Sequence, residues 1–261
     1  MLNNLTKTYL YVNSQHLEIS MKHSVYDLTV SGDTLFIADF RNNKVTLADL
    51  RDGNVQSSFQ VKMPHGITAT EDTVYVCTHR ENTVLVKRSD HERVSRSHYL
   101  DHPVSIVKCG DFILIANWGS GNAGNLLLTD SDLTNFNQFT TAWTNSKPHA
   151  VRVNKQDQII VAYRFAPGLV IFDSNGSIVA EKLFSDHFDP LSVASYKSCY
   201  LVPNSLDGYI YVFDAELNYL TKLYGGGHGP TNLAVWGNKL FVSEESANRV
   251  LAIQLDKIRN N

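Results

Sequence analysis

Six short apolar segments recur along the chain at nearly equal spacing, and each is followed by a polar turn. They read SVYDLTV, MPHGITA, HPVSIVK, KPHAVRV, DPLSVAS and GPTNLAV, and they align on six positions about 39 to 45 residues apart: Asp27, Gly66, Ser105, Ala150, Ser192 and Asn232. Five of the seven prolines lie two residues before these positions, a place we call the proline column: Pro64, Pro103, Pro148, Pro190 and Pro230. A fixed period of this length predicts a repeated supersecondary unit.

Each unit continues with two further strand-like segments. The second strands read TLFIAD, TVYVCT, FILIAN, QIIVAY, CYLVPN and KLFVSE. The third strands of the first two units read KVTLAD and TVLVKR, and more polar outer segments such as VQSSFQV and IVAEKLF follow the third strands. These segments are rich in β-branched and aromatic residues, and no unit shows a helical period. Four strands repeated six times predict an all-β fold, a six-bladed β-propeller with four-stranded antiparallel blades.

The last unit ends after its third strand, so an N-terminal segment is expected to close the ring. We predict that residues 16–20, HLEIS, supply the missing outer strand, while residues 8–13, TYLYVN, are either an extra strand or part of this closing blade. The chain is then one domain over residues 1–261, with a closing strand region at 1–22 and blades that start near residues 23, 63, 102, 147, 189 and 229.

Composition narrows the function classes. Hydrophobic residues make up 43% and charged residues 19%, and 23 basic against 26 acidic residues give a net charge of -3 without a basic cluster. Binding to a nucleic-acid backbone would therefore lack its main driving force. The first fifteen residues do not show a basic region followed by a long apolar stretch, and no segment approaches 18 apolar residues. We expect a cytoplasmic protein with no membrane partner, whose three separated cysteines are small buried thiols.

Polar side chains are expected to converge at one rim of the ring. Innermost strands lie side by side around the axis of a propeller, so the residues directly after the proline column share one face: Tyr26, His65, Val104, His149, Leu191 and Thr231. The ends of the second strands return to this top face with Asp39, Thr78, Asn117, Tyr163, Asn204 and Glu244. Adjoining loops add Arg41, His79, Arg80, Trp118, Arg164 and Glu245. Loops at a channel mouth are a usual place for a small-molecule site.

Histidines gather at the same rim. Six of the ten lie close to the proline column, one in each unit: His23, His65, His102, His149, His187 and His228. Imidazoles bind metals and move protons near neutral pH, which favours chemistry at this face. The alternative is that a rim histidine only hydrogen-bonds a neighbouring carbonyl, and we favour it for His23, His102 and His187. His65 and His149 share one register two blades apart, about 120° around the channel, from where both could reach one ion.

Two stretches carry a family resemblance. PHGITATEDTVYVCTHRENTV and TLFIADFRNNKVTLAD resemble the NHL-type and related six-bladed propellers, a group that includes the regucalcin-like gluconolactonases. The resemblance covers nearly the whole chain and implies the propeller fold. It does not fix the activity, because such propellers include lyases, lactonases, metal-dependent hydrolases and pure interaction modules.

The two PH motifs partly resemble those of the peptidylglycine amidating lyases, whose catalytic zinc is held by histidines on alternate blades. That resemblance makes His65 and His149 two metal ligands, while the third place holds Thr231; His228, Glu244 or a water would have to complete the shell. Virginiamycin-type lyases also have working histidines in PH phrases, but they have seven blades. The regucalcin-like resemblance instead implies calcium on oxygen donors, here Asp39, Asn117, Asn204 and Glu244, which otherwise only solvate the channel.

The leading hypothesis is a metal-dependent lyase or hydrolase that acts on a small polar molecule at the top face. A zinc, manganese or calcium ion near His65 and His149 would polarise a substrate oxygen or activate water, Tyr163 or Glu244 would move the proton, and Arg164 or Arg80 would hold an anionic group. The other binding residues are Tyr26, Asp39, Asn117, Trp118, Asn204 and Thr231.

Two alternatives stay open beside this hypothesis. The first is a non-enzymatic module that binds a protein or peptide through Trp118, Phe165 and the arginines. The second is a sensor that binds a ligand without turnover. No GxSxG, phosphate-loop or HExxH motif is present, and residues 119–125 form a long loop that, with Trp118, could be a lid or a pocket wall.

Overall fold

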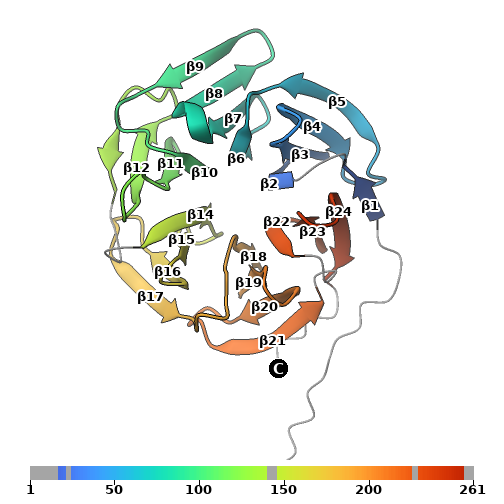
Figure 1. Cartoon of the computed structure of the whole chain (residues 1–261), viewed down its shortest axis with the longest axis vertical. Helices are drawn as coiled ribbons and strands as arrows, with labels where there is room; N and C mark the ends of the chain where they lie inside the picture. The colour runs from blue at the N-terminus through green and yellow to red at the C-terminus, as the bar shows by residue number, and fades with distance from the viewer. Residues whose placement is uncertain (1–16, 22–24, 140–145, 225–228, 256–261) are drawn as a thin grey trace, which may run out of the picture.

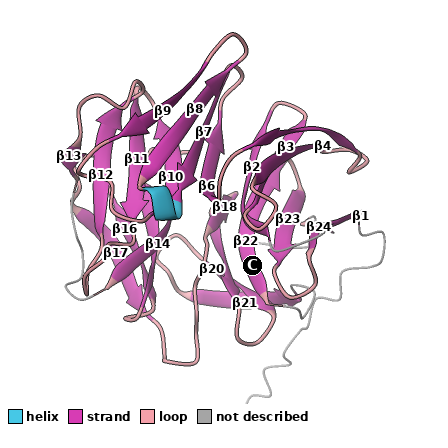
Figure 2. Cartoon of the chain, turned by 45° about the horizontal axis from the view of Figure 1, so that its top comes forward, coloured by secondary structure: helices cyan, strands magenta, loops and turns pink. Residues whose placement is uncertain are grey.

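The computed structural model describes residues 17–21, 25–139, 146–224 and 229–255, and within them it shows six four-stranded antiparallel sheets arranged in a ring (Figure 1). The protein is a six-bladed β-propeller, as its repeat predicts. Apart from strands, the described residues contain a three-residue 3-10 turn, η1 (His79–Glu81), drawn in cyan in Figure 2. They include no helix long and apolar enough to cross a membrane.

The first three blades are meanders in which each strand pairs with the next one in sequence. Blade 1 contains β2 (Val25–Ser31), β3 (Thr34–Asp39), β4 (Lys44–Asp49) and β5 (Val55–Gln60). Blade 2 contains β6 (Pro64–Ala69), β7 (Thr73–Thr78), β8 (Thr83–Arg88) and β9 (Glu92–Arg96). Blade 3 contains β10 (Pro103–Cys109), β11 (Phe112–Asn117), β12 (Asn125–Asp130) and β13 (Asn137–Gln138).

The other blades follow the same order, except that the sixth takes one strand from the N-terminal region. Blade 4 contains β14 (Lys147–Val153), β15 (Ile159–Arg164), β16 (Gly168–Phe172) and β17 (Ile178–Leu183). Blade 5 contains β18 (Ala194–Tyr196), β19 (Cys199–Asn204), β20 (Tyr209–Phe213) and β21 (Tyr219–Tyr224). Blade 6 contains β22 (Pro230–Trp236), β23 (Lys239–Glu244), β24 (Arg249–Gln254) and β1 (Leu17–Ser20).

The predicted closure of the ring is confirmed. Strand β1 pairs with β24 in antiparallel register, with Leu17 opposite Ala252 and Ser20 opposite Arg249. This pairing joins the N-terminal region to the last blade, so the outer edge of β24 is covered. Residue 16 of the predicted segment, and the segment at 8–13 for which the sequence allows two places, lie outside the described residues.

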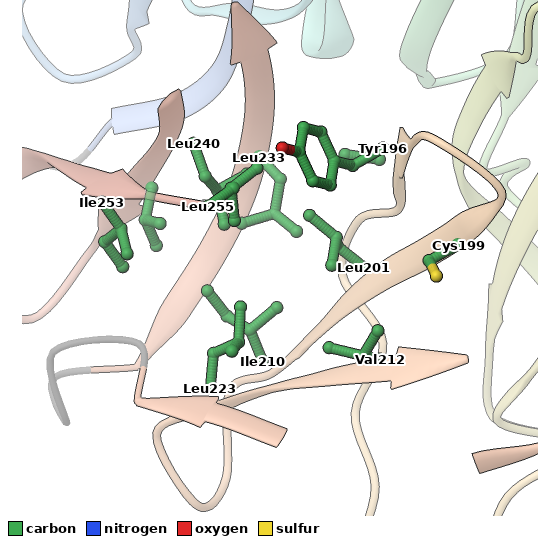
Figure 3. Close-up of a cluster of buried hydrophobic side chains, with 12 residues drawn as sticks. Tyr196, Cys199, Leu201, Ile210, Val212, Leu223, Leu233, Leu240, Ile253 and Leu255 are labelled. Atoms are coloured by element: carbon green, nitrogen blue, oxygen red, sulfur yellow. The ribbon is translucent and has the colours of Figure 1, made fainter. Parts of the chain in front are cut away.

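Apolar side chains between neighbouring blades form the core. Figure 3 shows one such cluster between blades 5 and 6, where Leu201, Ile210 and Val212 face Leu233 and Leu240. All five are 0% or 1% exposed, and full burial of each such side chain is worth about 1.5–3 kcal/mol. Similar clusters lie between other pairs of blades, so each blade is held by its neighbours rather than by a core of its own.

The proline column has the same structural place in the blades. Pro64, Pro103, Pro148 and Pro230 each pair with the last or next-to-last residue of the second strand of their own blade. The register then shifts after the proline, across one residue in blades 3, 4 and 6 and across His65 and Gly66 in blade 2. A bulge re-aims a side chain, so the repeat turns the post-proline residues toward the channel mouth.

A buried polar network crosses the ring beneath that mouth. Asp27 on β2 is 2% exposed and accepts hydrogen bonds from the backbone amides of Leu28 (2.9 Å) and Ile67 (3.0 Å). Arg152 on β14 donates to Asp27 Oδ1 at 2.6 Å, and also to the side chains of Ser105 (3.0 Å) and Asn232 (3.1 Å). This central network connects the innermost strands of five blades through their side chains and backbone.

Close packing of the inner strands explains one glycine of the repeat. A Cβ atom added at Gly66 would lie 2.5 Å from Ser105 Cα and 2.7 Å from the Val104 carbonyl oxygen. Both atoms belong to the backbone of the next inner strand and cannot move aside. Any larger residue here would separate β6 from β10, and both strands carry parts of the channel mouth.

Candidate functional site

Two imidazoles face the channel mouth from equivalent bulges in blades 2 and 4. The ring centroids of His65 and His149 are 6.0 Å apart, at an interplanar angle of 70°. The blade between them contributes only Val104 at this register, which leaves room for the two rings to approach. The structure therefore places the two rings close together, while their predicted role as ligands of one metal ion stays a prediction.

The orientation of each ring is fixed by the next blade. His65 Nδ1 is 2.7 Å from the carbonyl oxygen of Val104, and His149 Nδ1 is 2.7 Å from that of Leu191. A carbonyl oxygen only accepts hydrogen bonds, so Nδ1 must carry the proton in both residues. In the neutral form of each ring, Nε2 is then a bare lone pair.

Burial keeps both rings neutral. Desolvation lowers the pKa of His65 well below its usual 6.5, and the nearby His149 and His79 rings lower it further. Burial likewise lowers the pKa of His149 to about 4, since the charged form loses its hydration. At neutral pH the mouth therefore presents two unprotonated nitrogens with no positive charge on either ring.

A third imidazole stands beside them on η1. The His79 ring is 5.2 Å from that of His65 and 5.0 Å from that of His102, and burial lowers its pKa to about 4. Its Nδ1 is buried and has no hydrogen-bond partner among the described residues. A buried nitrogen without a hydrogen-bond partner costs stability unless a ligand or water bonds to it. The Nδ1 atom of His79 is therefore available to a bound molecule.

The half-buried His102 connects this group to solvent. Its Nδ1 is 2.7 Å from Asp101 Oδ1, and Asp101 also accepts hydrogen bonds from the backbone and hydroxyl of Ser120. The rings of His102, His79, His65 and His149 thus form a continuous series from the surface to the channel. The interpretation of His102 as a residue that only bonds a carbonyl is not what the described contacts show.

The phenol ring of Tyr26 lies beside His65. Its ring centroid is 4.5 Å from the His65 ring and 4.6 Å from that of Phe40. Burial, and next the negative charge of Glu245, raise the pKa of the Tyr26 phenol. Three arginines, at positions 41, 80 and 164, act in the opposite direction. The phenol stays protonated at neutral pH, and the arginines give the mouth a positive rim.

Three predicted site residues take part in ion pairs or in the apolar core. Glu244 is 0% exposed and accepts a hydrogen bond from Arg249 Nε at 2.5 Å. Tyr163 lies in the apolar cluster between blades 3 and 4. Arg164 donates through Nε and Nη2 to the two carboxylate oxygens of Asp189, at 2.7 and 2.9 Å. These three side chains serve the fold in the described structure, whereas Arg80 is exposed at the rim.

The predicted oxygen donors are also bonded within their own loops. Asp39 accepts from the backbone and side chain of Asn42. Asn117 bonds to Tyr99, Asp101 and Asn125, and Asn204 bonds in the equivalent way to His187, Asp189 and Leu206. Thr231 bonds to Ser243. Each of these side chains therefore has a partner within the protein. His23 and His228 lie outside the described residues.

The residues present fit a metal ion only in part. His65 and His149 have the arrangement of metal-binding histidines, in which Nδ1–H is held by a carbonyl and Nε2 is left for the ion. However, no group of three His, Cys, Asp or Glu residues that could hold a metal occurs in the described parts of the chain. Two imidazoles alone do not complete the four-coordinate shell that zinc usually takes.

A wall of aromatic and basic side chains borders the histidines on the blade 4 side. The Trp118 ring is 5.6 Å from that of His149 and 5.4 Å from that of Phe165. Lys147 Nζ lies 5.1 Å from the Trp118 centroid. The sequence predicts Trp118 as a binding residue but gives no sign of Lys147, although this lysine directly precedes the proline column of blade 4.

Comparison with known proteins supports the class of fold. No protein-family model and no curated protein matches the sequence. Among solved structures, virginiamycin B lyase from Staphylococcus aureus aligns at a TM-score of 0.72 and 12% identity over 92% of this chain and 99% of that one. A catalytically inactive histidine-to-alanine variant of that enzyme, with quinupristin, gives 0.70 and 13% over 88% and 80%. A chain of a nidogen/laminin complex gives 0.67 and 15% over 77% and 80%.

These identities show a shared fold and nothing finer. The chain is a β-propeller of the architecture found in enzymes and in binding proteins alike. The side chains at the channel mouth are what distinguish an enzyme from a binding protein here.

Proposed function

We propose that the protein is a lyase-type enzyme that acts on a small, polar, anionic molecule at the channel mouth. The observation that carries the proposal is the pair of neutral imidazoles on alternate blades, each with Nδ1–H held by a carbonyl and Nε2 bare. An interaction module has no need of two oriented, unprotonated bases 6.0 Å apart. The structural similarity to a lyase is in line with this proposal, but it carries less weight.

The proposed chemistry is proton transfer. Nε2 of His65 or His149 removes a proton from the substrate, and the Tyr26 phenol, held protonated by burial, donates a proton to the departing group. A low pKa makes an imidazole a weak base in the empty site. An anionic substrate beside the rings raises their pKa by Coulomb attraction, so the base strengthens when the substrate binds.

The rim charges indicate the sign of the substrate. Arg41 and Arg80 act on Tyr26 electrostatically, and neither forms an ion pair with a carboxylate of the described residues. Their positive potential attracts a carboxylate or phosphate toward the mouth. Arg164 contributes less, because Asp189 already neutralises it.

A divalent ion is a secondary part of the proposal. Zinc, manganese or calcium on His65 and His149 would polarise a substrate oxygen or activate water, and would make hydrolysis available as well as elimination. The third ligand would have to come from a water or from outside the described residues.

Substitution of either central histidine is expected to lower turnover. A panel of small hydroxy- and aminocarboxylates in D₂O, followed by proton NMR, reports both deuterium uptake next to the carboxylate and new vinyl protons. His65→Gln and His149→Gln should each lower the rate at least about tenfold, because a positioned general base contributes about 10²–10⁴-fold. The variant His187→Gln, which changes an exposed histidine, should retain the wild-type rate.

Full turnover in both central variants would reject the proposal, and absence of turnover together with binding of peptides at this face would favour the interaction module. Calorimetric titration of the same variants with zinc, manganese and calcium shows whether stoichiometric metal binding depends on the two imidazoles.

A further inference from the structure

A hollow beside the histidines has no role in the proton transfer described above. It has a volume of about 510 Å³ and is lined by Gly121, Asn122, Lys147 and Phe165. Pockets that hold small molecules measure about 300–1,000 Å³. The long loop after β11 forms one side, and Gly124 lets that loop return closely, since a Cβ there would lie 2.2 Å from the Asn117 carbonyl oxygen.

One of the lining residues, Lys147, carries a buried positive charge. Lys147 is 8% exposed, and its Nζ donates to the Gly119 carbonyl oxygen at 2.9 Å. None of the carboxylates in the described residues forms an ion pair with it. An ammonium group has three donors, and its burial is costly without a countercharge. An anion bound in the hollow would supply the missing countercharge and accept a hydrogen bond from Lys147 Nζ.

Neighbouring Arg164 does not compete for that anion. Its guanidinium makes a strong bidentate pair with Asp189, so the positive charge of Arg164 is already neutralised by that carboxylate. Lys147 is thus the cation available to a bound group in the hollow.

Flat apolar surface lies next to the charge. Phe165 is 71% exposed, and its backbone has a φ of 71°, a left-handed conformation that is unusual for a bulky residue. Its ring is inclined at 62° to the Trp118 ring. Residues in sparsely populated backbone conformations cluster at ligand sites, and an aromatic ring of a ligand packs favourably against exposed aromatic side chains.

We propose that this hollow is a substrate subsite for an aryl carboxylate, with the carboxylate on Lys147 and the ring against Trp118 and Phe165. The inference deepens the proposed function and rests on it, because Trp118 also contacts the His149 ring and so joins the subsite to the proton-transfer groups. The substrate class becomes small aromatic carboxylic acids rather than polar anions in general.

Three probes separate charge from ring. Phenylacetate carries both features, phenylacetamide lacks the charge, and cyclohexylacetate lacks the aromatic ring; binding of each is measured by calorimetry. Lys147→Met should weaken phenylacetate at least about tenfold and leave phenylacetamide unchanged, while Lys147→Arg retains most of the affinity. Phe165→Ala should weaken phenylacetate more than cyclohexylacetate. Lys155→Met, at an exposed lysine of the β14–β15 turn, is the matched control.

The subsite is rejected if phenylacetate does not bind the wild-type protein at millimolar concentration, or binds Lys147→Met equally well. Thermal melting of each variant verifies folding, and Lys147→Arg keeps the test decisive if Lys147→Met is unstable. Failure here is distinguishable from failure of the proposed function. Turnover that depends on His149, without phenylacetate binding, would reject the subsite and leave the proposed enzyme. Phenylacetate binding without turnover of any substrate would reject the enzyme and leave the hollow as a binding site for aryl carboxylates.

Discussion

Acidification from pH 6.5 to about pH 4 is expected to lower the free energy of unfolding by at least about 3 kcal/mol. The folded-state pKa values of His149 and His79 are lowered from 6.5 to about 4, and that of His65 is lowered well below 6.5. Between these values the unfolded chain binds protons that the folded protein does not, so stability falls as pH falls. The His149 shift alone is worth about 3 kcal/mol at 1.36 kcal/mol per pKa unit.

Burial raises the pKa of Asp27 above its usual 3.8, so protonation of this carboxylate opposes the effect of the imidazoles. The pKa of Asp130 is lowered from 3.8 by hydrogen bonds from Thr134, so its stabilising effect is lost only below this pH range. Urea denaturation at closely spaced pH values measures the slope. His149→Gln should flatten it by up to one proton, and His187→Gln should leave it unchanged. A stability that is constant from pH 6.5 to 4.5 would show that the central rings are protonated or solvated.

Replacement of Asp27 by alanine is expected to destabilise the protein by about 3–5 kcal/mol, because it leaves the guanidinium of Arg152, whose side chain is 16% exposed, without its countercharge. The carboxylate is 2% exposed and accepts three hydrogen bonds, from Leu28, Ile67 and Arg152. Since Arg152 also holds Ser105 and Asn232, the loss should loosen the innermost strands of several blades together.

A matched surface pair provides the control. Asp33 forms an ion pair with Arg51 at 3.1 Å, with both side chains more than half exposed, and Asp33→Ala should leave the denaturation midpoint nearly unchanged. The double variant Asp27→Ala with Arg152→Ala should be less destabilised than the sum of the two single variants. Equal small effects at Asp27 and Asp33 would mean that the central network does not hold the ring together.

Much of the architecture is readable from the sequence because the repeat fixes register. The predicted second strands at 34–39, 73–78 and 112–117 coincide with β3, β7 and β11, since turn residues mark both ends of each apolar run. Blade 3 is less regular. Its outer strand β13 has two residues, and the sequence there shows no alternation of apolar and polar residues that would predict a strand.

The site is predictable in position but not in partners. The shared register of His65 and His149 follows from the PH motifs, and the post-proline bulge explains why both rings turn inward. The sequence does not show that Glu244 pairs with Arg249, or that Arg164 pairs with Asp189. These ion pairs depend on which oppositely charged side chains the fold places next to each other. Lys147 escapes sequence-based prediction for the same reason, because only the fold shows that its ammonium group is buried without a carboxylate.

The central claim, two neutral imidazoles with bare Nε2 atoms in one channel mouth, is tested most directly by long-range ¹H–¹⁵N correlation NMR of ¹⁵N-histidine-labelled protein at pH 7. Assignment comes from the spectra of His65→Gln and His149→Gln. In a neutral ring Nε2 couples to both carbon-bound protons and Nδ1 mainly to one, so the two nitrogens can be told apart. We predict an unprotonated Nε2 and a protonated Nδ1 in both residues; charged rings, or protons on Nε2, would contradict the account.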